Sequence, residues 1–384
     1  MRVLLTAFDT FPSAKGASAH IAHNLAAISR FAKEVTLACP GAFGDPMAQS
    51  EDGITILRCP MTHPNFLFRA ESFGQFVSGL LGRTGAKWDV IHFRDIWGGI
   101  PALHHPTAGD KLKIFEVNGL ASIEAPYRYP AVAHSPSLLG RIREMEDFCL
   151  KGADKIITVS QVNADHIASR GVPRSRITVI PNTSAIGSAT IHRGDPGSKN
   201  RILYSGSLAP WQGVDTLLRA FALLAPRGDV RLTLAASNKK FLKPHMELAA
   251  RLGIQEEMEV KMAIGMDDLA TLYNSSAVSV APLARDGRNL RQGACPIKIF
   301  DSMAMGTPLV ASDIPITREI LEDGVDSLLV RPDSPRALAM AITRLLDDSA
   351  LAESLGAAAR DKFEIEYSMT VFFDKLKNAY QEAS

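Results

Sequence analysis

The stretch ACPIKIFDSMAMGTPLVASD, residues 294–313, decides the fold because it joins a loop, a helix and a buried strand. The loop is Ala294-Cys295-Pro296, and the helix is predicted over residues 297–305 and ends at Gly306. Residues 309–311 form a short apolar strand. Such a unit places a helix N-terminus beside a strand end, where backbone N–H groups and the helix dipole favour phosphate. Asp301, one turn into the helix, is suited to hold a ribose hydroxyl, so the stretch indicates a nucleoside-diphosphate site.

The rest of the chain alternates strands and helices in two halves. Strands are predicted near residues 2–7, 34–38, 54–58, 88–93, 113–117, 155–159 and 177–180, and the RDIWGG segment at 94–99 is predicted to be a loop. A polar linker at 183–200 follows, and the pattern then restarts at residue 201. This alternation predicts an α/β fold of two Rossmann-like, doubly wound parallel-sheet domains, residues 1–185 and 195–365, facing a central cleft. We expect a C-terminal helix, at about 366–384, to pack back on the first domain.

The composition is that of an ordinary soluble protein, with 384 residues, 46% hydrophobic and 22% charged. A net charge of +1 gives no bulk field that would draw the chain onto nucleic acid. The four cysteines are scattered without a CxxC pair, which argues against a metal or disulfide framework and for a reducing, cytoplasmic location. The N-terminus is typical of a first strand and not of a signal peptide. No apolar run of about 18 residues is present to span a membrane.

Three loops at strand ends are candidates for the cleft. In the first, residues 12–20, Gly16 and Ala17 allow close backbone approach at a helix start, although a helix start can need small residues for packing alone. The second, residues 205–213, carries Gly206 and Ser207, and Ser207 is a candidate phosphate donor. Trp211, in the same loop, either covers the cleft or caps the helix.

The third loop, residues 285–301, gathers four cations near one helix start. Their charge suits a diphosphate, although a solvated surface loop would also carry such residues. The candidate donor-binding residues of this loop are Arg288, Arg291, Cys295, Pro296, Ile297, Lys298 and Asp301. Met262, at the end of a predicted strand over 259–262, is a further candidate for the donor site.

Motifs for other chemistry are missing from the sequence. No GxGxxG follows a strand, and no GxxxxGK[ST], GxSxG or HExxH occurs. No Asp-x-Asp occurs either, so the metal–diphosphate clamp of many nucleotide-sugar enzymes is absent. Among the histidines, His20 is the best functional candidate because it lies on the helix after the first loop, although a lone histidine is more often structural.

These residues together resemble the family-four retaining glycosyltransferases, which have the two-domain GT-B fold. The most specific part is residues 296–348, which is similar to the family's donor-site signature and its continuation. Residues 11–20, 159–182 and 204–224 add to the resemblance in the expected order. The resemblance implies transfer of a sugar from a nucleotide-sugar donor bound mainly by the second domain, without a metal or other cofactor. UDP-sugars are favoured by their prevalence in the family.

The sequence departs from the family pattern at five positions. The second acid of the family's Glu-x7-Glu pair is Asp301 here, and the first falls on Gly293. The phosphate-binding Arg and Lys of the family fall on Ser207 and Gln212, so we expect Lys298, with Arg288 or Arg291, to supply part of that charge. The His near the reacting sugar falls on Asn118, which holds a hydroxyl but cannot act as a base. Asn118, His20 and Lys298 are therefore the candidate catalytic residues.

The retaining pattern implies that the leaving diphosphate itself takes the acceptor proton, while the protein positions the substrates and stabilises charge. The acceptor, a glycan, a lipid-linked molecule or a small molecule, is expected to contact residues 65–72 and 122–137. Two alternatives remain open at this point, a GT-B sugar-nucleotide epimerase and an inactive nucleotide-binding scaffold. The amphipathic segment at 138–151 leaves peripheral membrane contact open, with a solvated helix face as the simpler interpretation. The oligomeric state is not indicated.

Overall fold

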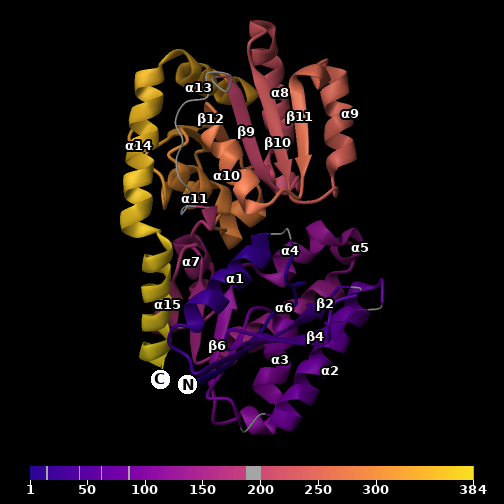
Figure 1. Ribbon diagram of the computed structural model, residues 1–384. Coiled ribbons are helices and arrows are strands. Elements are labelled where there is room, and N and C mark those ends of the chain that lie inside the picture. The colour runs from indigo at the N-terminus through magenta and orange to yellow at the C-terminus, as the bar shows by residue number, and fades with distance from the viewer. Residues whose placement is uncertain (14–15, 43, 62, 85–86, 187–199, 384) are drawn as a thin grey trace.

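The computed structural model describes residues 1–13, 16–42, 44–61, 63–84, 87–186 and 200–383 of the chain (Figure 1). Two α/β domains lie one above the other, and the C-terminal helices run along the side of both. Most of the expected linker, residues 187–199, falls outside the described residues. In the described part of the chain, no helix is both long enough and apolar enough to cross a membrane.

The first domain is built on an eight-stranded sheet of order β3-β4-β2-β1-β5-β6-β7-β8. Every neighbouring pair is parallel except β3 and β4, which are antiparallel. The central strands are apolar on both faces because helices cover both sides of a parallel sheet. The strands are β1 (Arg2–Thr6), β2 (Glu34–Gly41), β3 (Ala48–Glu51), β4 (Ile54–Pro60), β5 (Val90–Phe93), β6 (Leu112–Val117), β7 (Lys155–Thr158) and β8 (Ile177–Val179).

The helices of the first domain include one that the sequence did not predict. The RDIWGG segment opens α3, whose N-terminus is capped by Asp95 accepting the N–H groups of Trp97 and Gly98. A Cβ at Gly98 would overlap Thr6 of β1, so the glycines that suggested a loop serve close helix–strand packing. The helices are α1 (Gly16–Ile28), α2 (Phe66–Thr84), α3 (Ile96–His104), α4 (Ala121–Arg128), α5 (Pro130–Ala133), α6 (Pro136–Gly152) and α7 (Gln161–Ser169).

The second domain has a six-stranded, fully parallel sheet of order β11-β10-β9-β12-β13-β14. Its strands are β9 (Arg201–Gly206), β10 (Arg231–Ala236), β11 (Met258–Met262), β12 (Val278–Ala281), β13 (Leu309–Ser312) and β14 (Leu328–Val330). Its helices are α8 (Val214–Leu224), α9 (Leu242–Leu252), α10 (Met266–Asn274), α11 (Ile297–Met305), α12 (Pro315–Arg318) and α13 (Pro335–Asp347). The predicted class, two doubly wound α/β domains, is confirmed by this topology.

The stretch 294–313 forms α11 and β13 as the sequence predicts. Gly306 ends α11 in the left-handed conformation, with φ of 62°, and its N–H bonds back to the last turn. A Cβ at Gly356 of α14 (Ser349–Glu366) would overlap the carbonyl of Gly306, so these two helices pack at backbone contact.

The C-terminal part is two helices that belong to different domains. Helix α14 packs on α11 of the second domain, whereas α15 (Met369–Ala383) packs on α1 of the first (Figure 1). Phe372, Leu376 and Tyr380 of α15 join the first-domain core beside Val3 and Ile21. The chain therefore returns to its first domain at its end.

Candidate functional site

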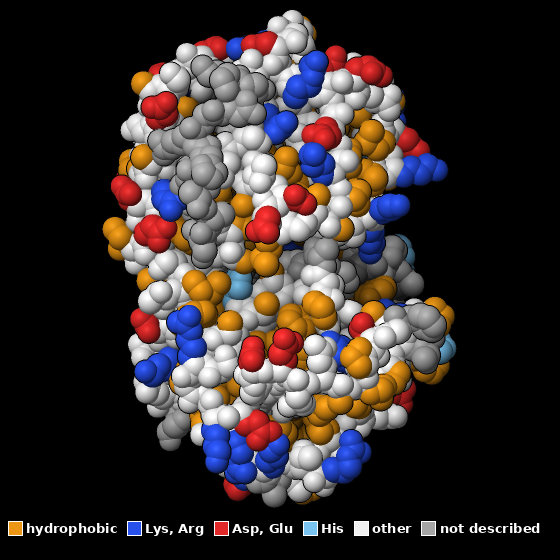
Figure 2. Space-filling model, in the orientation of Figure 1, with side chains coloured by type: hydrophobic (Ala, Val, Ile, Leu, Met, Phe, Trp, Pro, Cys, Tyr) orange, Lys and Arg blue, Asp and Glu red, His pale blue; other side chains and the backbone are white. Residues whose placement is uncertain are grey.

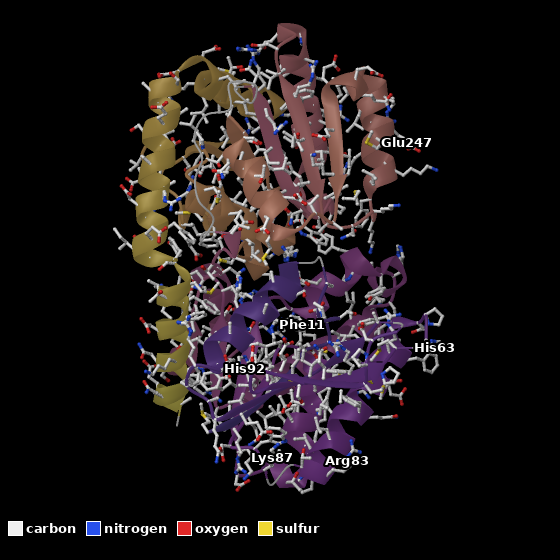
Figure 3. All side chains as sticks on the ribbon, in the orientation of Figure 1. Phe11, His63, Arg83, Lys87, His92 and Glu247 are labelled. Atoms are coloured by element: carbon white, nitrogen blue, oxygen red, sulfur yellow. The ribbon has the colours of Figure 1, made fainter. Side chains whose placement is uncertain are left out.

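A large cavity lies between the two domains, at the carboxyl ends of both sheets. Its volume is about 1050 Å³, and residues of both domains line it. Figure 2 shows apolar side chains at the waist between the two halves, and Figure 3 places Phe11, one of the lining residues, in the first domain below the waist. Ligands of open α/β sheets bind at this end of the strands.

Two helix N-termini lie close together in the lining of the cavity. Helix α11 starts at Ile297 without a side-chain cap, and α1 starts at Gly16. A Cβ at Gly16 would lie 3.5 Å from the Ile297 side chain, so the two ends are in close approach. Ala17 also lines the cavity. Two positive dipole ends at one place favour an anion between them.

Lys298 lies in the first turn of α11 and is buried. Its Nζ donates to Gln212 Oε1 at 2.8 Å and lies 3.8 Å from the centre of the Tyr204 ring. Gly206 has φ of 126°, and a Cβ there would lie 3.2 Å from Nζ. Gly206, Ser207 and Gln212 line the cavity beside Lys298, as the sequence analysis expects. Burial holds the pKa of Lys298 well below its usual range, opposed by the charge of Asp301.

Asp301 lies one turn further along α11 and is also buried. Burial raises its pKa to about 7, while a hydrogen bond from Ser184 and the charge of Lys298 act to lower it. The Ser184 hydroxyl donates to Asp301 Oδ1 at 2.7 Å, from the segment that leads out of the first domain. Two ionisable groups with opposite pKa shifts therefore share one wall of the cavity, which is typical of functional sites.

The loop before α11 is held by the first domain. Asn182 donates its backbone N–H to the Cys295 sulfur at 3.2 Å and its side-chain amide to the Cys295 carbonyl at 2.6 Å. Burial raises the pKa of the Cys295 thiol to about 12, so the thiol is neutral and structural. Cys295, Pro296 and Ile297 all line the cavity.

Two expected donor residues, Arg291 and Met262, lie outside the cavity lining, and a third, Arg288, lies in the lining but is engaged by the first domain. Arg288 lines the cavity, but it pairs with Glu124 of α4 at 2.9 Å and its guanidinium carbon lies 4.9 Å from the centre of the Trp211 ring. Arg291 is exposed outside the cavity lining because Arg288–Gln292 form a π-helical turn that directs it away. Met262 packs on the core of the second domain, and residues 263–266, which follow it, line the cavity instead.

Gly293, where the family carries its first acid, has no room for a side chain. Its φ is 78°, and a Cβ would lie 2.6 Å from Ser160 Oγ and 2.7 Å from the Asn163 N–H nitrogen at the start of α7. Glu319 of the second domain also accepts from the N–H groups of Gln161 and Val162. Contact between the domains therefore excludes the acid that the family pattern expects here.

A buried carboxylate, Glu116, organises the first-domain wall. Its oxygens accept from Asn24 Nδ2 at 2.5 Å, from Arg94 Nε at 2.9 Å and from Asn118 Nδ2. The side chains of His20 and His92 also approach it at 3.1 Å. Although burial alone would raise its pKa, Arg94 and His20 hold the pKa of Glu116 well below the usual range.

The two first-domain candidates, Asn118 and His20, both line the cavity and both contact Glu116. Because Asn118 donates its amide N–H to Glu116, its amide oxygen is left to receive a hydroxyl. Burial lowers the pKa of His20, so the ring is neutral near pH 7, and its Nε2 has no partner among the described residues. His92 lies deeper, where its Nδ1 lies 2.6 Å from the hydroxyl of Tyr380 on α15 (Figure 3).

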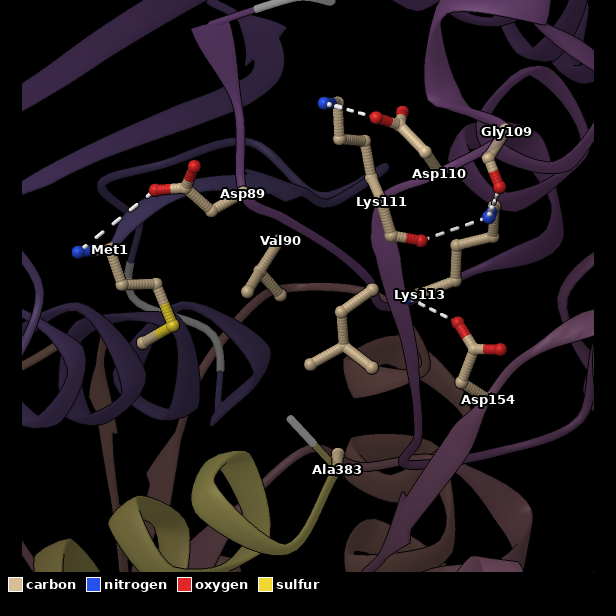
Figure 4. Close-up of a pocket in the computed structure, with 10 residues that line it drawn as sticks. Met1, Asp89, Val90, Gly109, Asp110, Lys111, Lys113, Asp154 and Ala383 are labelled. Carbon is tan, nitrogen blue, oxygen red and sulfur yellow. Dashed lines mark hydrogen bonds and ion pairs between the residues drawn. The ribbon is translucent and has the colours of Figure 1, made fainter.

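A second depression, of about 590 Å³, lies at the opposite end of the first sheet (Figure 4). It is lined by the beginnings of β5 and β6, and its charges are paired. The Lys113 ammonium donates to the carbonyls of Gly109 and Lys111, and Lys111 pairs with Asp110 at 3.0 Å. Its place at the amino ends of the strands sets it apart from the ligand end of the sheet.

Sequence reasoning missed Glu116, Glu124 and Tyr204. Glu116 is an isolated acid within the apolar strand KIFEV, and an acid there is a signal because a charge inside a buried strand needs partners. Glu124 and Tyr204 carry no such signal, because their roles depend on contacts with residues distant in the sequence.

Two Rossmann-like domains that meet at a cleft of this kind define the GT-B class of glycosyltransferases. Residues 15–183 match the family model described as "Glycosyl transferase 4-like domain", and residues 199–348 match the one described as "Glycosyl transferases group 1". The two models span both domains between them, and the chain therefore belongs to the family-four glycosyltransferases. Both describe transferases, which favours this activity over the epimerase and scaffold alternatives.

Relatives agree with this assignment. The chain is 26% identical to a D-inositol 3-phosphate glycosyltransferase of Thermobispora bispora, over 88% of this chain and 82% of the relative. Its fold is similar to that of sucrose-phosphate synthase from Thermosynechococcus elongatus, with a TM-score of 0.83, 18% identity, and coverage of 100% and 98%. It is also similar to Anabaena Alr3699/HepE, solved in complex with UDP and glucose, with a TM-score of 0.75, 15% identity, and 99% coverage of both chains.

Proposed function

We propose that the protein transfers a sugar, with retention of configuration, from a nucleoside-diphosphate sugar to an acceptor hydroxyl. The observation that carries the proposal is the placement of Lys298 and Asp301, one turn apart at the start of α11, close to the start of α1. Cation, carboxylate and two helix N-termini in one cavity match the diphosphate and ribose of a nucleotide. A UDP-sugar is favoured, because HepE, which shares the fold, is solved with UDP and glucose.

The donor is proposed to sit with its ribose hydroxyls donating to Asp301 and its diphosphate near Lys298. The Lys298 ammonium, now bonded to the neutral amide oxygen of Gln212, gains a charged partner when the donor binds. A charge-assisted hydrogen bond is about twice as strong as a neutral one. This accounts for a donor site in which Ser207 and Gln212 are uncharged.

In the proposed reaction the acceptor oxygen forms a bond to the anomeric carbon while the bond from that carbon to the diphosphate oxygen breaks. The acceptor proton passes to the leaving diphosphate oxygen, which serves as the base on the same face. Lys298 and the α11 N-terminus stabilise the negative charge that develops on the leaving group. Asn118, fixed by Glu116, offers its amide oxygen to a hydroxyl of the transferred sugar. The charge stabilisation comes from protein groups, so we propose that the reaction is independent of a metal.

Thermal unfolding with UDP-, GDP-, ADP- and dTDP-sugars tests the donor. A cognate ligand at 100 times its Kd adds about 2.7 kcal/mol to the free energy of unfolding, so one nucleotide class is expected to raise Tm. Proton NMR of the first product formed with the stabilising donor then reports the anomeric configuration, with and without EDTA. An inverted product, or loss of turnover in EDTA, would contradict the proposed mechanism. Failure of every sugar nucleotide to shift Tm would overturn the proposed donor class.

A further inference from the structure

The first-domain wall of the reaction cavity carries a patch of four half-buried aromatic side chains. They come from four segments that are separate in sequence, which are the end of β1, the start of α2, the start of α3 and the turn between α4 and α5. All four line the cavity that also holds Asn118 and Lys298. This aromatic patch consists of Phe8, Phe66, Trp97 and Tyr129.

The rings of the aromatic patch are packed against one another. Phe66 stacks on Tyr129 with centroids 4.3 Å apart and an interplanar angle of 26°, and it meets Trp97 edge to face at 5.4 Å. Phe8 lies 6.3 Å from Trp97 and 5.3 Å from the buried Phe73. A sugar stacks on an open ring face, whereas Phe66 and Tyr129 cover one face of each other and each of the four rings contacts another ring of the patch. The surface left to a ligand is therefore a continuous apolar one.

Exposed apolar side chains also lie at the start of α2, outside the cavity lining. Leu67 and Phe68 directly follow Phe66 at the start of α2, and they are 41% and 55% exposed. Phe68 packs on His63 at 4.6 Å, and His63 lies at the outer edge of the first domain (Figure 3). The same helix end therefore presents one aromatic side chain to the cavity and two apolar side chains to the protein surface.

Two of the charged side chains beside the patch, Asp95 and Arg69, are engaged within the protein, while Asp9, which follows Phe8, also lines the cavity. Asp95 accepts from the N–H groups of Phe8, Trp97 and Gly98, which holds the patch together. The Arg69 guanidinium donates to the carbonyls of His63 and Pro64 at 3.1 and 2.6 Å. These groups position the patch and offer little to a polar ligand, so hydrocarbon is the chemistry that the patch fits.

We infer that the acceptor carries an extended hydrocarbon chain, which packs on the aromatic patch and leaves the cavity over Leu67 and Phe68. The inference rests on the proposed transferase function and names the class of its second substrate. The acceptor hydroxyl would lie near Asn118, because Asn118 and the aromatic patch line the same cavity. The substrate is then amphiphilic, with its polar end at the donor and its apolar end at the surface.

Binding of alkyl glucosides of increasing chain length, without a donor, tests the inference. Methyl, butyl and octyl β-D-glucopyranoside are titrated below micellar concentrations, with calorimetry as the readout. Affinity is expected to rise along the series, by up to roughly three- to fourfold for each methylene that becomes buried. Equal affinity of methyl and octyl glucoside would overturn the inference.

Phe66→Ala is expected to reduce the affinity for octyl glucoside at least tenfold and to leave that for methyl glucoside unchanged. Phe148→Ala is the matched control, since Phe148 is also an exposed aromatic stacked on a histidine, but on α6 and outside the cavity lining. If Phe66→Ala lowers the affinities for octyl and methyl glucoside equally, the ring stacks on the sugar. If Phe66→Ala and Phe148→Ala have equal effects on affinity, the aromatic patch does not bind the alkyl chain. Either result overturns the inference.

Tyr129→Ser, at the turn between α4 and α5, replaces Phe66→Ala if that variant does not fold. The same loss of chain-length dependence is expected, and its retention would contradict the inference. Sugar-nucleotide binding is measured separately by thermal shift. If a donor raises the Tm of both wild type and variant but alkyl chain length has no effect on affinity, only the inference of a hydrocarbon-bearing acceptor is refuted. Absence of any donor shift refutes the proposed function instead.

Discussion

The two walls of the cleft bury charge in different ways. In the first domain, several polar and charged side chains contact the Glu116 carboxylate and satisfy it. They are Arg94, Asn24, Asn118, His20 and His92. In the second domain, Lys298 is buried with one neutral hydrogen-bond partner, Gln212, and with Asp301 one turn away. The first arrangement is complete without a ligand, whereas the second gains from an added anion. We infer that the first-domain wall positions the substrates and that the second-domain wall binds the anionic part of the donor.

The largest expected effect is a loss of stability when the Glu116 cluster of the first domain is disrupted. Glu116→Ala leaves the buried Arg94 without its carboxylate, and losing one partner of a buried pair costs about 3–5 kcal/mol of unfolding free energy. Urea unfolding measures this loss. Glu144→Ala removes an exposed carboxylate paired with Arg141 and is the control, with an expected cost below about 1 kcal/mol. Equal costs in the two variants would show that the Glu116 cluster is not the organising centre of its wall.

Lys298→Ala tests the second-domain wall, where Lys298 lacks a charged hydrogen-bond partner. We expect this variant to lose more activity than stability. The loss of a cation at the leaving group is expected to lower kcat/KM by about 10²–10³. The free energy of unfolding should change little, because burial of the Lys298 ammonium is itself unfavourable. Arg291→Ala, a cation of the same segment that lies outside the cavity lining, is expected to retain near-normal kcat/KM. Unchanged donor affinity and turnover in Lys298→Ala would refute its role.

Gly293→Ala tests the contact between the walls. The added Cβ would overlap Ser160 and Asn163 at a backbone position with φ of 78° and ψ of 160°, which L-residues rarely adopt, so we expect a loss of about 1–3 kcal/mol in urea unfolding. Gly324→Ala is the matched control, because Gly324 has a similar φ of 75° and nothing within 4 Å of its Cβ position. The difference between the two variants isolates the overlap from the backbone strain. Equal losses of unfolding free energy in the two variants would mean that the domain interface adjusts to the added methyl group at little cost.

The smallest effect is the pH dependence of donor binding through Asp301. Its pKa of about 7 in the folded protein means that the carboxyl is largely protonated below pH 7 and ionised above it. Ribose hydroxyls donate to the ionised form, so donor affinity should rise with pH and fall by up to about tenfold per unit below pH 7. The raised pKa also means that protonation of Asp301 favours the folded state, a contribution that is lost as pH rises through 7. In Asp301→Asn, measured by calorimetry, this part of the pH dependence should disappear.

Much of the fold could be predicted from the sequence because the patterns that indicate its strands and helix ends are local. The apolar runs fix the strands, and Gly306 with its flanking residues marks the end of α11 correctly. Helix α3 was missed because Gly98 and Gly99 are read locally as helix-breaking, whereas they allow contact with Thr6 and Phe93. The antiparallel strand β3, all of whose residues are exposed, lacks an apolar pattern and was missed for that reason.

The site was predictable where it depends on position along one element and not where it depends on contacts. Lys298 and Asp301 share a helix face, and Gly206, Ser207 and Gln212 follow the strand that reaches it. The directions of Arg288 and Arg291 depend instead on a π-helical turn and on Glu124 of the other domain. Glu116 gathers partners from helix α1, from strand β5 and from the turns after β5 and β6, and no spacing in the sequence encodes that convergence.

The course of the chain has a mechanical consequence. The polypeptide leaves the first domain near Ser184 and returns to it between α14 and α15, so two covalent connections join the two bodies. Two fixed points define an axis, and relative rotation about that axis displaces atoms in proportion to their distance from it. Asp301 accepts a hydrogen bond from Ser184 at the first connection and so lies close to the axis, whereas α5, next to the aromatic patch, lies on the far side of the first domain from α14 and α15 (Figure 1). Opening of the cleft would therefore widen the acceptor side most and leave the ribose site nearly still.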